Sequence, residues 1–383
     1  MNGELSPEQV KRIAHIKSHL DRGFKLDQLV RNIENGLGNP RACLMSLSRH
    51  AEASGFYAWF AERDLTSMRQ WFHTAAKLDR KWYQMEENKQ GYGSNMLRLI
   101  KPLVSNDRSL IEWFAHYDQV YWLDRVEEPT TPDFWAYQAM VALRGEWPRL
   151  IERCEKVMRA PAGAASEQQY LRDHEFYLAL ARRDVGTMTE ALHKLVTPKM
   201  VKVRNNDDIG YARDLISTAA VIYAKIAWFH GYEVRVDSPY IPSEWLPMEP
   251  LQRYDDRYGF IWSEATERAW RSADMSTQPK IDPPLLQARS NRLKRLLEAY
   301  SDSEPEAALC LKHLSPLFAD VMANKIHAPR RGVAPCAFYF VEGRLRRHPE
   351  LEEAFADFSA ALQGLDDATL RALRRGNIDI HDK

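Results

Sequence analysis

Cysteine is scarce in this sequence, and neither sign of charge is in excess. The 383-residue chain has four cysteines without a Cys-x-x-Cys pair, Cys43, Cys154, Cys310 and Cys336. Their wide spacing argues against a disulfide framework or a zinc site and favours buried free thiols in a reducing compartment. Lysine plus arginine equals aspartate plus glutamate at 53 each, so the composition does not imply wholesale binding to nucleic acid or to an anionic membrane.

Long apolar segments are also missing. The N-terminus, MNGELSPEQVKR, is polar and lacks the apolar core of a signal peptide. No run approaches the roughly 18 apolar residues that a membrane-spanning helix needs. We therefore expect a cytoplasmic protein without a membrane partner.

The sequence contains none of the common catalytic motifs: no Walker A loop, no GxGxxG, no HExxH and no GxSxG. His15 and His19 have the spacing of metal ligands on a helix, but no third ligand lies near them in the sequence. The adjacent acids Asp255 and Asp256 are the best remaining candidates for a metal-assisted hydrolase, and we rank that alternative last. We expect no enzyme activity, no catalytic residue, no cofactor and no metal.

Helical periodicity is what the sequence does have. Between residues 65 and 88, apolar residues recur every three or four positions and predict one broad buried stripe. Ser6 and Asp184 are suited to cap helices that start just after them. Helices are predicted at about 6–21, 26–35, 40–55, 65–88, 95–103, 107–116, 118–125, 132–144, 147–159, 166–183, 185–196, from 207 or 208 to 231, 285–300, 304–326, 349–363 and 366–375.

The run from Gly231 to Pro242 interrupts this helical pattern. Gly231 ends an apolar helix, and residues 232–236 then alternate like a strand. An Asp-Ser-Pro turn follows, and its two polar side chains can hydrogen-bond the turn backbone. A second strand candidate lies at 337–341. Structural rather than binding roles are predicted for Gly231, Asp237, Ser238, Tyr240 and Pro242.

These patterns predict an all-α fold of stacked helical hairpins, with a degenerate repeat and at most a small two-stranded β element. Eleven tryptophans and sixteen tyrosines are predicted first of all to lock neighbouring helices together. We expect three regions: an N-terminal helical array over 1–160, a core over 161–262 and a C-terminal helical region over 263–383.

Charge is unevenly placed along the chain. Residues 105–133 hold seven acids and two arginines, a net charge of −5, and residues 325–348 hold six bases and one acid, a net charge of +5. We favour the interpretation that the two stretches neutralise each other or remain solvated. The other interpretation is that the acidic, aromatic stretch binds a basic partner. Its candidate binding residues are Asp118, Tyr121, Trp122, Asp124, Glu127 and Glu128.

The order of motifs in the second half of the chain resembles a known family. An aromatic helix runs from Tyr170 to Asp184, a long apolar helix follows it, and Gly231-Tyr232-Glu233-Val234 then precedes Asp237-Ser238-Pro239-Tyr240-Ile241-Pro242. Upstream, the helix around Phe72–Asp79 fits the same pattern. Together these segments are similar to immunity protein family 49 of bacterial polymorphic toxin systems. The sequence after about residue 262 has no counterpart in this resemblance.

The resemblance implies a non-enzymatic, all-helical cytoplasmic protein that binds a cognate toxin protein and blocks it stoichiometrically. A basic nuclease is one candidate for that toxin. The alternative is a helical-repeat adaptor that binds other proteins and has no toxin partner. The sequence leaves open the self-association of the chain, the activity of the toxin and the role of the C-terminal third.

Overall fold

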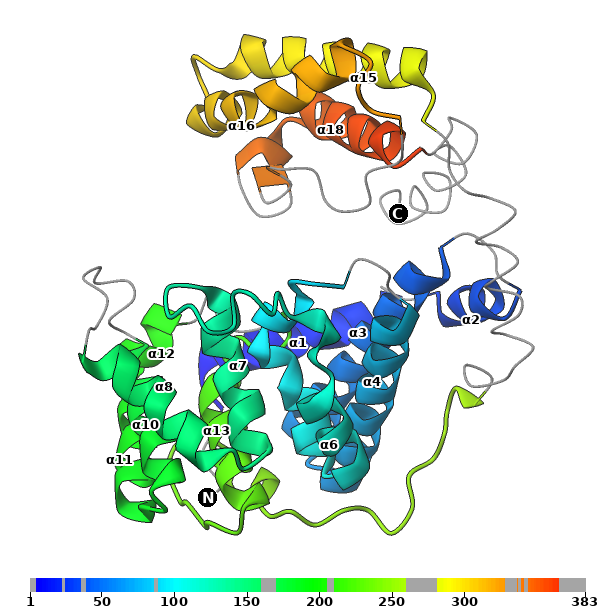
Figure 1. The fold of residues 1–383 in the computed structure, drawn as a ribbon. Helices are drawn as coiled ribbons and strands as arrows, with labels where there is room; N and C mark the ends of the chain where they lie inside the picture. The colour runs from blue at the N-terminus through cyan, green and yellow to red at the C-terminus, as the bar shows by residue number, and fades with distance from the viewer. Residues whose placement is uncertain are drawn as a thin grey trace. The chain divides into compact units, whose positions relative to one another are not determined.

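The computed structural model describes residues 5–22, 25–35, 39–85, 89–159, 170–204, 210–259, 281–327, 336, 339–340 and 344–364. Helices make up the regular structure of these residues and no strand occurs among them, which confirms the all-α fold (Figure 1). The chain divides into two compact units, Met1–Ala273 and Asp274–Lys383, each with a hydrophobic core of its own. The three sequence regions stay a prediction, and the boundary near residue 160 falls inside unit 1.

Unit 1 begins with four helices: α1 (Pro7–Arg22), α2 (Leu26–Glu34), α3 (Pro40–Phe60) and α4 (Leu65–Met85). At the start of α1, Ser6 and Gln9 satisfy each other's backbone N–H groups through their side chains, at 3.2 and 3.0 Å. Helices α3 and α4 form a long hairpin, drawn side by side in Figure 1. Met68, Phe72 and Leu78 of the predicted stripe are buried between them and their neighbours.

Helix α3 continues past Gly55, where the sequence predicted its end. An added Cβ at Gly55 would lie 3.0 Å from the Phe72 ring, closer than nearly all real contacts of this kind. The glycine is therefore explained by the close approach of α4 rather than by a helix end. Phe60 is the last residue of the helix.

The rest of unit 1 surrounds an apolar helix, α13 (Thr218–Phe229), whose residues from Thr218 to Ala227 are all buried. Asp184 caps α11 as predicted, because its side chain accepts a hydrogen bond of 3.0 Å from the Thr187 N–H. The other helices here are α5 (Ile100–Ser105), α6 (Arg108–His116), α7 (Pro132–Leu143), α8 (Trp147–Arg159), α10 (Leu171–Ala181), α11 (Val185–Leu195) and α12 (Pro198–Arg204).

Helix α13 starts at Thr218, later than the sequence predicted, and the acids proposed to start it, Asp207 and Asp208, lie outside the described residues. Asp214 interrupts the helical pattern, since its φ of 69° is left-handed and its carboxylate pairs with Arg12 at 3.1 Å. The Ser217 N–H then donates to the Tyr240 carbonyl at 3.0 Å. Long-range contacts at 214 and 217 thus override the local helical signal.

The helix predicted over 118–125 is also wrong. A short 3₁₀ turn, Asp118–Val120, is followed by an irregular loop up to Thr131. We call residues 121–131 the Trp122 loop. Thr131 caps α7 and also donates to the Arg125 carbonyl at 2.7 Å, which draws the chain back on itself.

The alternating residues 232–236 are not a strand. Val234 and Val236 are buried and Glu233 and Arg235 are exposed, so the alternation is real. Its cause is packing on helices: the Trp228 indole of α13 donates to the Val234 carbonyl at 3.0 Å. The other strand candidate, 337–341, lies mostly outside the described residues, and Tyr339 and Phe340 within it are helical.

The motif segment turns the chain at the end of α13. Gly231 adopts a left-handed φ of 82° directly after the helix. Ser238 Oγ accepts from the Tyr240 N–H at 3.3 Å, whereas Asp237 is exposed. The Pro242 carbonyl accepts from the Trp245 N–H at 3.1 Å, which starts the next turn.

A buried lysine fastens the segment that follows. The Lys225 side chain, 0% exposed, donates to the Trp245 and Leu246 carbonyls at 2.9 and 3.2 Å and to Asn106 Oδ1. Asn106 is left-handed at φ 62°, and its amide donates to the carbonyls of Pro247 and Glu249, both at 2.9 Å. Trp245, also 0% exposed, packs against the rings of Phe56, Trp59, Phe60 and Phe72.

Unit 2 contains three main helices, α15 (Pro283–Tyr300), α16 (Pro305–Met322) and α18 (Pro349–Leu362). Their core includes Leu293, Leu314 and Phe358. A buried carboxylate, Asp357 of α18, pairs with Arg289 and with Arg292 of α15, the latter at 3.0 Å. The helix predicted over 366–375 lies outside the described residues.

Replacing Lys225 with methionine should lower the free energy of unfolding of unit 1 by roughly 2–5 kcal/mol, because three buried acceptors lose their donor. All eleven tryptophans precede residue 274, so urea unfolding followed by tryptophan fluorescence reports on unit 1. The exposed Lys202→Met is the matched control and should change stability by less than about 0.5 kcal/mol. Equal midpoints for the two variants would contradict the role given to Lys225.

Candidate functional site

The acidic stretch 105–133 is largely neutralised inside unit 1. Asp107 caps α6 and lies 3.2 Å from His73 Nε2, and Asp118 pairs with Arg144. Asp133 lies 3.6 Å from Arg125. The structure thus gives these acids partners within unit 1.

The Trp122 loop presents two large apolar side chains to solvent. Trp122 is 44% exposed and Leu123 is 61% exposed, although their neighbour Tyr121 is 4% exposed. The Tyr121 ring lies so close to Gly93 that an added Cβ there would be 2.7 Å away, and it packs edge-on against Tyr137. Tyr121 thus anchors the loop, Leu123 is exposed, and the Trp122 indole lies against Gly91 with 44% of the residue exposed.

Further contacts fix the rest of this loop. Val126 is buried, and the Trp135 indole donates to the Pro129 carbonyl at 2.6 Å. The Thr131 hydroxyl also lies 2.9 Å from the Glu128 carbonyl. An irregular segment anchored at 121, 126, 129 and 131 presents its exposed side chains in a defined arrangement, which lowers the entropy cost of binding.

Glu127 connects the loop to a buried polar chain. Its carboxylate pairs with Arg149 and, at 2.7 Å, with the buried Arg153. Arg153 Nε donates to Gln138 Oε1 at 2.7 Å, and Gln138 Nε2 lies 3.3 Å from His174 Nδ1. Since the amide oxygen already faces Arg153, the amide NH₂ faces His174, whose Nδ1 must then accept and carry no proton.

A small hollow lies beside the loop. Tyr83, Tyr117 and Tyr121 supply its aromatic walls, and Arg98 and Asn95 supply polar groups. The Arg98 guanidinium lies 5.2 Å from the Trp82 ring centre and 5.7 Å from that of Tyr83. The hollow is too small for a side chain of a partner, since its free space is about that of one water molecule.

The structure places the six predicted binding residues in different environments. Trp122, Asp124 and Glu128 are exposed, and Tyr121 is buried beneath them. Asp118 and Glu127 hold arginines of unit 1. The sequence analysis missed Leu123, although its position between Trp122 and Asp124 was an available signal. It also missed the hollow, because the residues that line it are distant from one another in the sequence.

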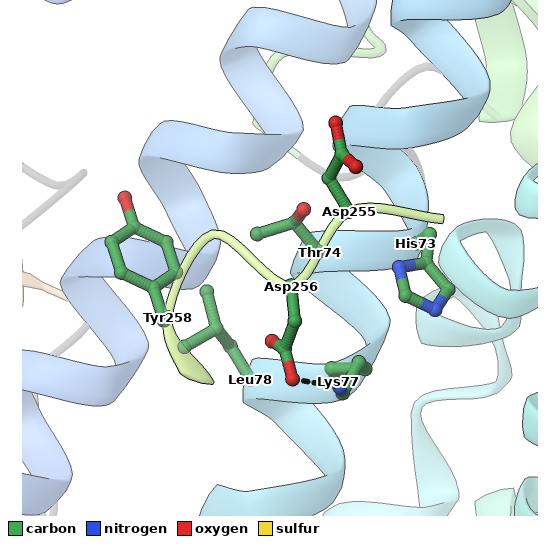
Figure 2. A pocket seen from close by; sticks show the side chains of 7 residues that line it. All are labelled: His73, Thr74, Lys77, Leu78, Asp255, Asp256 and Tyr258. Carbon is green, nitrogen blue, oxygen red and sulfur yellow. Dashed lines mark hydrogen bonds and ion pairs between the residues drawn. The ribbon is translucent and has the colours of Figure 1, made fainter. Parts of the chain in front are cut away.

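Asp255 and Asp256 do not form a carboxylate pair. Figure 2 shows Asp255 pointing away from Asp256, whose carboxylate lies 2.8 Å from the Lys77 ammonium. The Asp255 side chain is 74% exposed. The small hollow drawn there, lined also by His73 and Tyr258, thus lacks the paired acids that the hydrolase alternative requires.

His15 and His19 pack edge to face, with ring centres 4.5 Å apart. Burial, followed by the charges of His19 and Arg12, lowers the pKa of His15. Within the described ranges no group of three or more histidine, cysteine or acidic side chains is arranged to hold a metal ion.

Comparison with known families places this site in context. The family model described as Immunity protein 49 (Imm49) matches residues 62–245. Residues 62–245 belong to the immunity protein 49 family. The match contains the upstream helix and the Tyr170–Pro242 segment on which the sequence resemblance rested, and it ends at Trp245, the residue that Lys225 holds. No curated protein and no solved structure matches the chain.

The Trp122 loop and its hollow lie within the Imm49 region, whereas unit 2 lies outside it. Among the described residues, no helix is both long and apolar enough to cross a membrane.

Glu127 and Glu128 form a matched pair for testing the loop's anchoring. Glu127→Gln should lower the free energy of unfolding by about 1 kcal/mol, because the buried Arg153 loses its carboxylate partner. Glu128→Gln should change it by less than about 0.5 kcal/mol, since Glu128 is exposed and its carboxylate contacts the nearby Thr130 hydroxyl. Urea unfolding followed by tryptophan fluorescence measures both, and a larger loss for Glu128→Gln would refute the assignment.

His174 should make the stability of unit 1 depend on pH. Burial, and then the charge of Arg153, lower the pKa of His174 from 6.5 to about 4. The unfolded chain therefore binds the proton first, so this contribution is complete above pH 6.5 and is lost as the pH falls from 6.5 towards 4. We expect His174→Gln to remove roughly 2 kcal/mol of the stability difference between pH 7 and pH 4.5. An identical pH dependence in both proteins would show that folding does not lower the pKa of His174.

Proposed function

We propose that the chain is a non-enzymatic immunity protein that binds one cognate toxin protein and blocks it by stoichiometric occlusion. The observation that carries this proposal is the Imm49 match over residues 62–245. The cytoplasmic location and the absence of catalysis expected from the sequence are part of the same proposal.

The Trp122 loop is the surface we assign to the toxin. Exposed tryptophan on a rigid support is the residue type most enriched among binding hot spots. Because Tyr121, Val126 and Pro129 already fix the backbone, binding would need little further ordering. An exposed apolar pair on a fixed loop suits an apolar patch on a folded protein partner.

The Trp122 loop also carries exposed negative charge, which contributes less to binding than its apolar side chains. The exposed carboxylates of Asp124 and Glu128 flank the apolar pair, whereas Glu127 is paired with arginines. Free acids at the edge of an interface raise the association rate of a basic partner more than they raise its affinity. A basic toxin, such as a nuclease, fits these residues.

Replacing both Trp122 and Leu123 with alanine should weaken toxin binding by at least about 30-fold, because the exposed apolar contact is lost. The measurement is titration calorimetry with the toxin encoded by the neighbouring reading frame, together with growth of cells that co-express the two proteins. Val203→Ala removes a similarly exposed apolar side chain from α12 and should bind like the wild type.

Two results would contradict parts of the proposal. If the wild-type protein neither binds nor neutralises the neighbouring toxin, and a pull-down instead returns many unrelated proteins, the helical-repeat adaptor is the better account. If the wild type binds and the double variant binds equally well, the protein is an immunity protein whose toxin surface lies elsewhere.

A further inference from the structure

Two cysteines of unit 2 lie in contact with each other. Cys310, on α16, is completely buried, and Cys336 is partly accessible. The Cys336 thiol donates to the Cys310 carbonyl oxygen at 3.8 Å, which puts the two residues in contact. The two residues are 26 positions apart in the sequence, so the fold and not the chain's connectivity brings them together.

The surroundings of Cys336 differ from those of an inert buried thiol. His313, one turn along α16 from Cys310, places its Nδ1 3.8 Å from the Cys336 sulfur and can take its proton. Cys336 also has a left-handed φ of 80°, which is rare for a residue with a side chain. Burial raises the pKa of the Cys336 thiol, while the hydrogen bond from Cys310 lowers it.

The other two cysteines provide an internal contrast. Cys43 and Cys154 are buried in unit 1, on α3 and α8, and their nearest polar partners are the amides of Asn32 and Gln138 at 3.9 and 3.8 Å. Burial raises the pKa of the Cys154 thiol to about 12. Neither has a second thiol in contact, so oxidation should leave both unchanged.

We propose that Cys310 and Cys336 form a reversible disulfide when unit 2 meets a low-molecular-weight disulfide such as oxidised glutathione. Cys336 gives its proton to His313, and its thiolate attacks one sulfur of the oxidant. The S–S bond of the oxidant breaks, and the departing thiolate takes the proton from His313 and leaves as the first small thiol. Cys310 then attacks the Cys336 sulfur and releases the second small thiol, which takes up the Cys310 proton. One small disulfide is reduced to two thiols, and the protein loses two hydrogen atoms.

The bond would fasten residue 336 to α16 and close a loop of 26 positions. Closing a loop of this length restricts the unfolded chain and should stabilise unit 2 in particular. The inference concerns a part of the chain outside the Imm49 match and does not depend on the proposed toxin binding. With the thiol pKa values raised, we expect exchange over hours rather than seconds at neutral pH.

The test counts thiols in the full-length protein. Reduced protein is incubated with oxidised glutathione, quenched with acid, denatured and alkylated, and its mass is measured. The wild type should fall from four alkylated cysteines to two, with no glutathione attached and with a tryptic cross-link between the Cys310 and Cys336 peptides. The Cys43→Ser/Cys154→Ser double variant should likewise lose two thiols, and dithiothreitol should restore them.

A single substitution separates the two steps. Cys310→Ser removes the second thiol, so Cys336 should then retain one glutathione as a stable mixed disulfide. The inference is overturned if the wild type keeps four free thiols after prolonged incubation, or if it retains glutathione on Cys336 as the Cys310→Ser variant does. It is also overturned if the two lost thiols map to Cys43 and Cys154.

Discussion

The side chain of Lys225 is the interaction on which the arrangement of unit 1 depends. Burial lowers the pKa of its amine well below the ordinary value, a cost that only good hydrogen-bond partners can offset. Asn106 and the carbonyls of Trp245 and Leu246 are those partners. Through them α13 holds the corner between α5 and α6 and the segment that carries Trp245, and Trp245 in turn joins α3 to α4.

The Trp122 loop, which we propose as the binding surface, is held by a separate set of contacts. The Trp122 loop has little regular structure of its own, and it is fixed instead by Tyr121 against Gly93 and by Glu127 against arginines of α8. The acids of the loop consequently serve two purposes. Glu127 holds the loop against α8, whereas the side chains of Asp124 and Glu128 are exposed. The acidic stretch therefore presents less charge to solvent than its composition indicates.

The sequence predicted features whose cause is local. The Asp184 cap and the apolar stripe of α4 follow from neighbouring residues and were found. Three predictions failed: the helix over 118–125, residues 210–217 of the helix predicted from 207 or 208 to 231, and the strand over 232–236. Side-chain contacts decide these segments: Thr131 with the Arg125 carbonyl, Arg12 with Asp214, and Trp228 with the Val234 carbonyl. Within the candidate site, exposed acids could be predicted, but the hollow and the pairing of Glu127 arise from packing that a single sequence does not encode locally.

Hydrogen–deuterium exchange of the protein with and without its toxin tests the central claim most directly, because it maps the contact surface without any substitution. The account predicts that toxin slows exchange at the backbone amides of residues 121–131, the Trp122 loop, and of residues 89–98, which include one wall of its hollow. Exchange around Lys225 and Trp245 should be slow in both states. Protection confined to unit 2, with the Trp122 loop unchanged, would contradict the account.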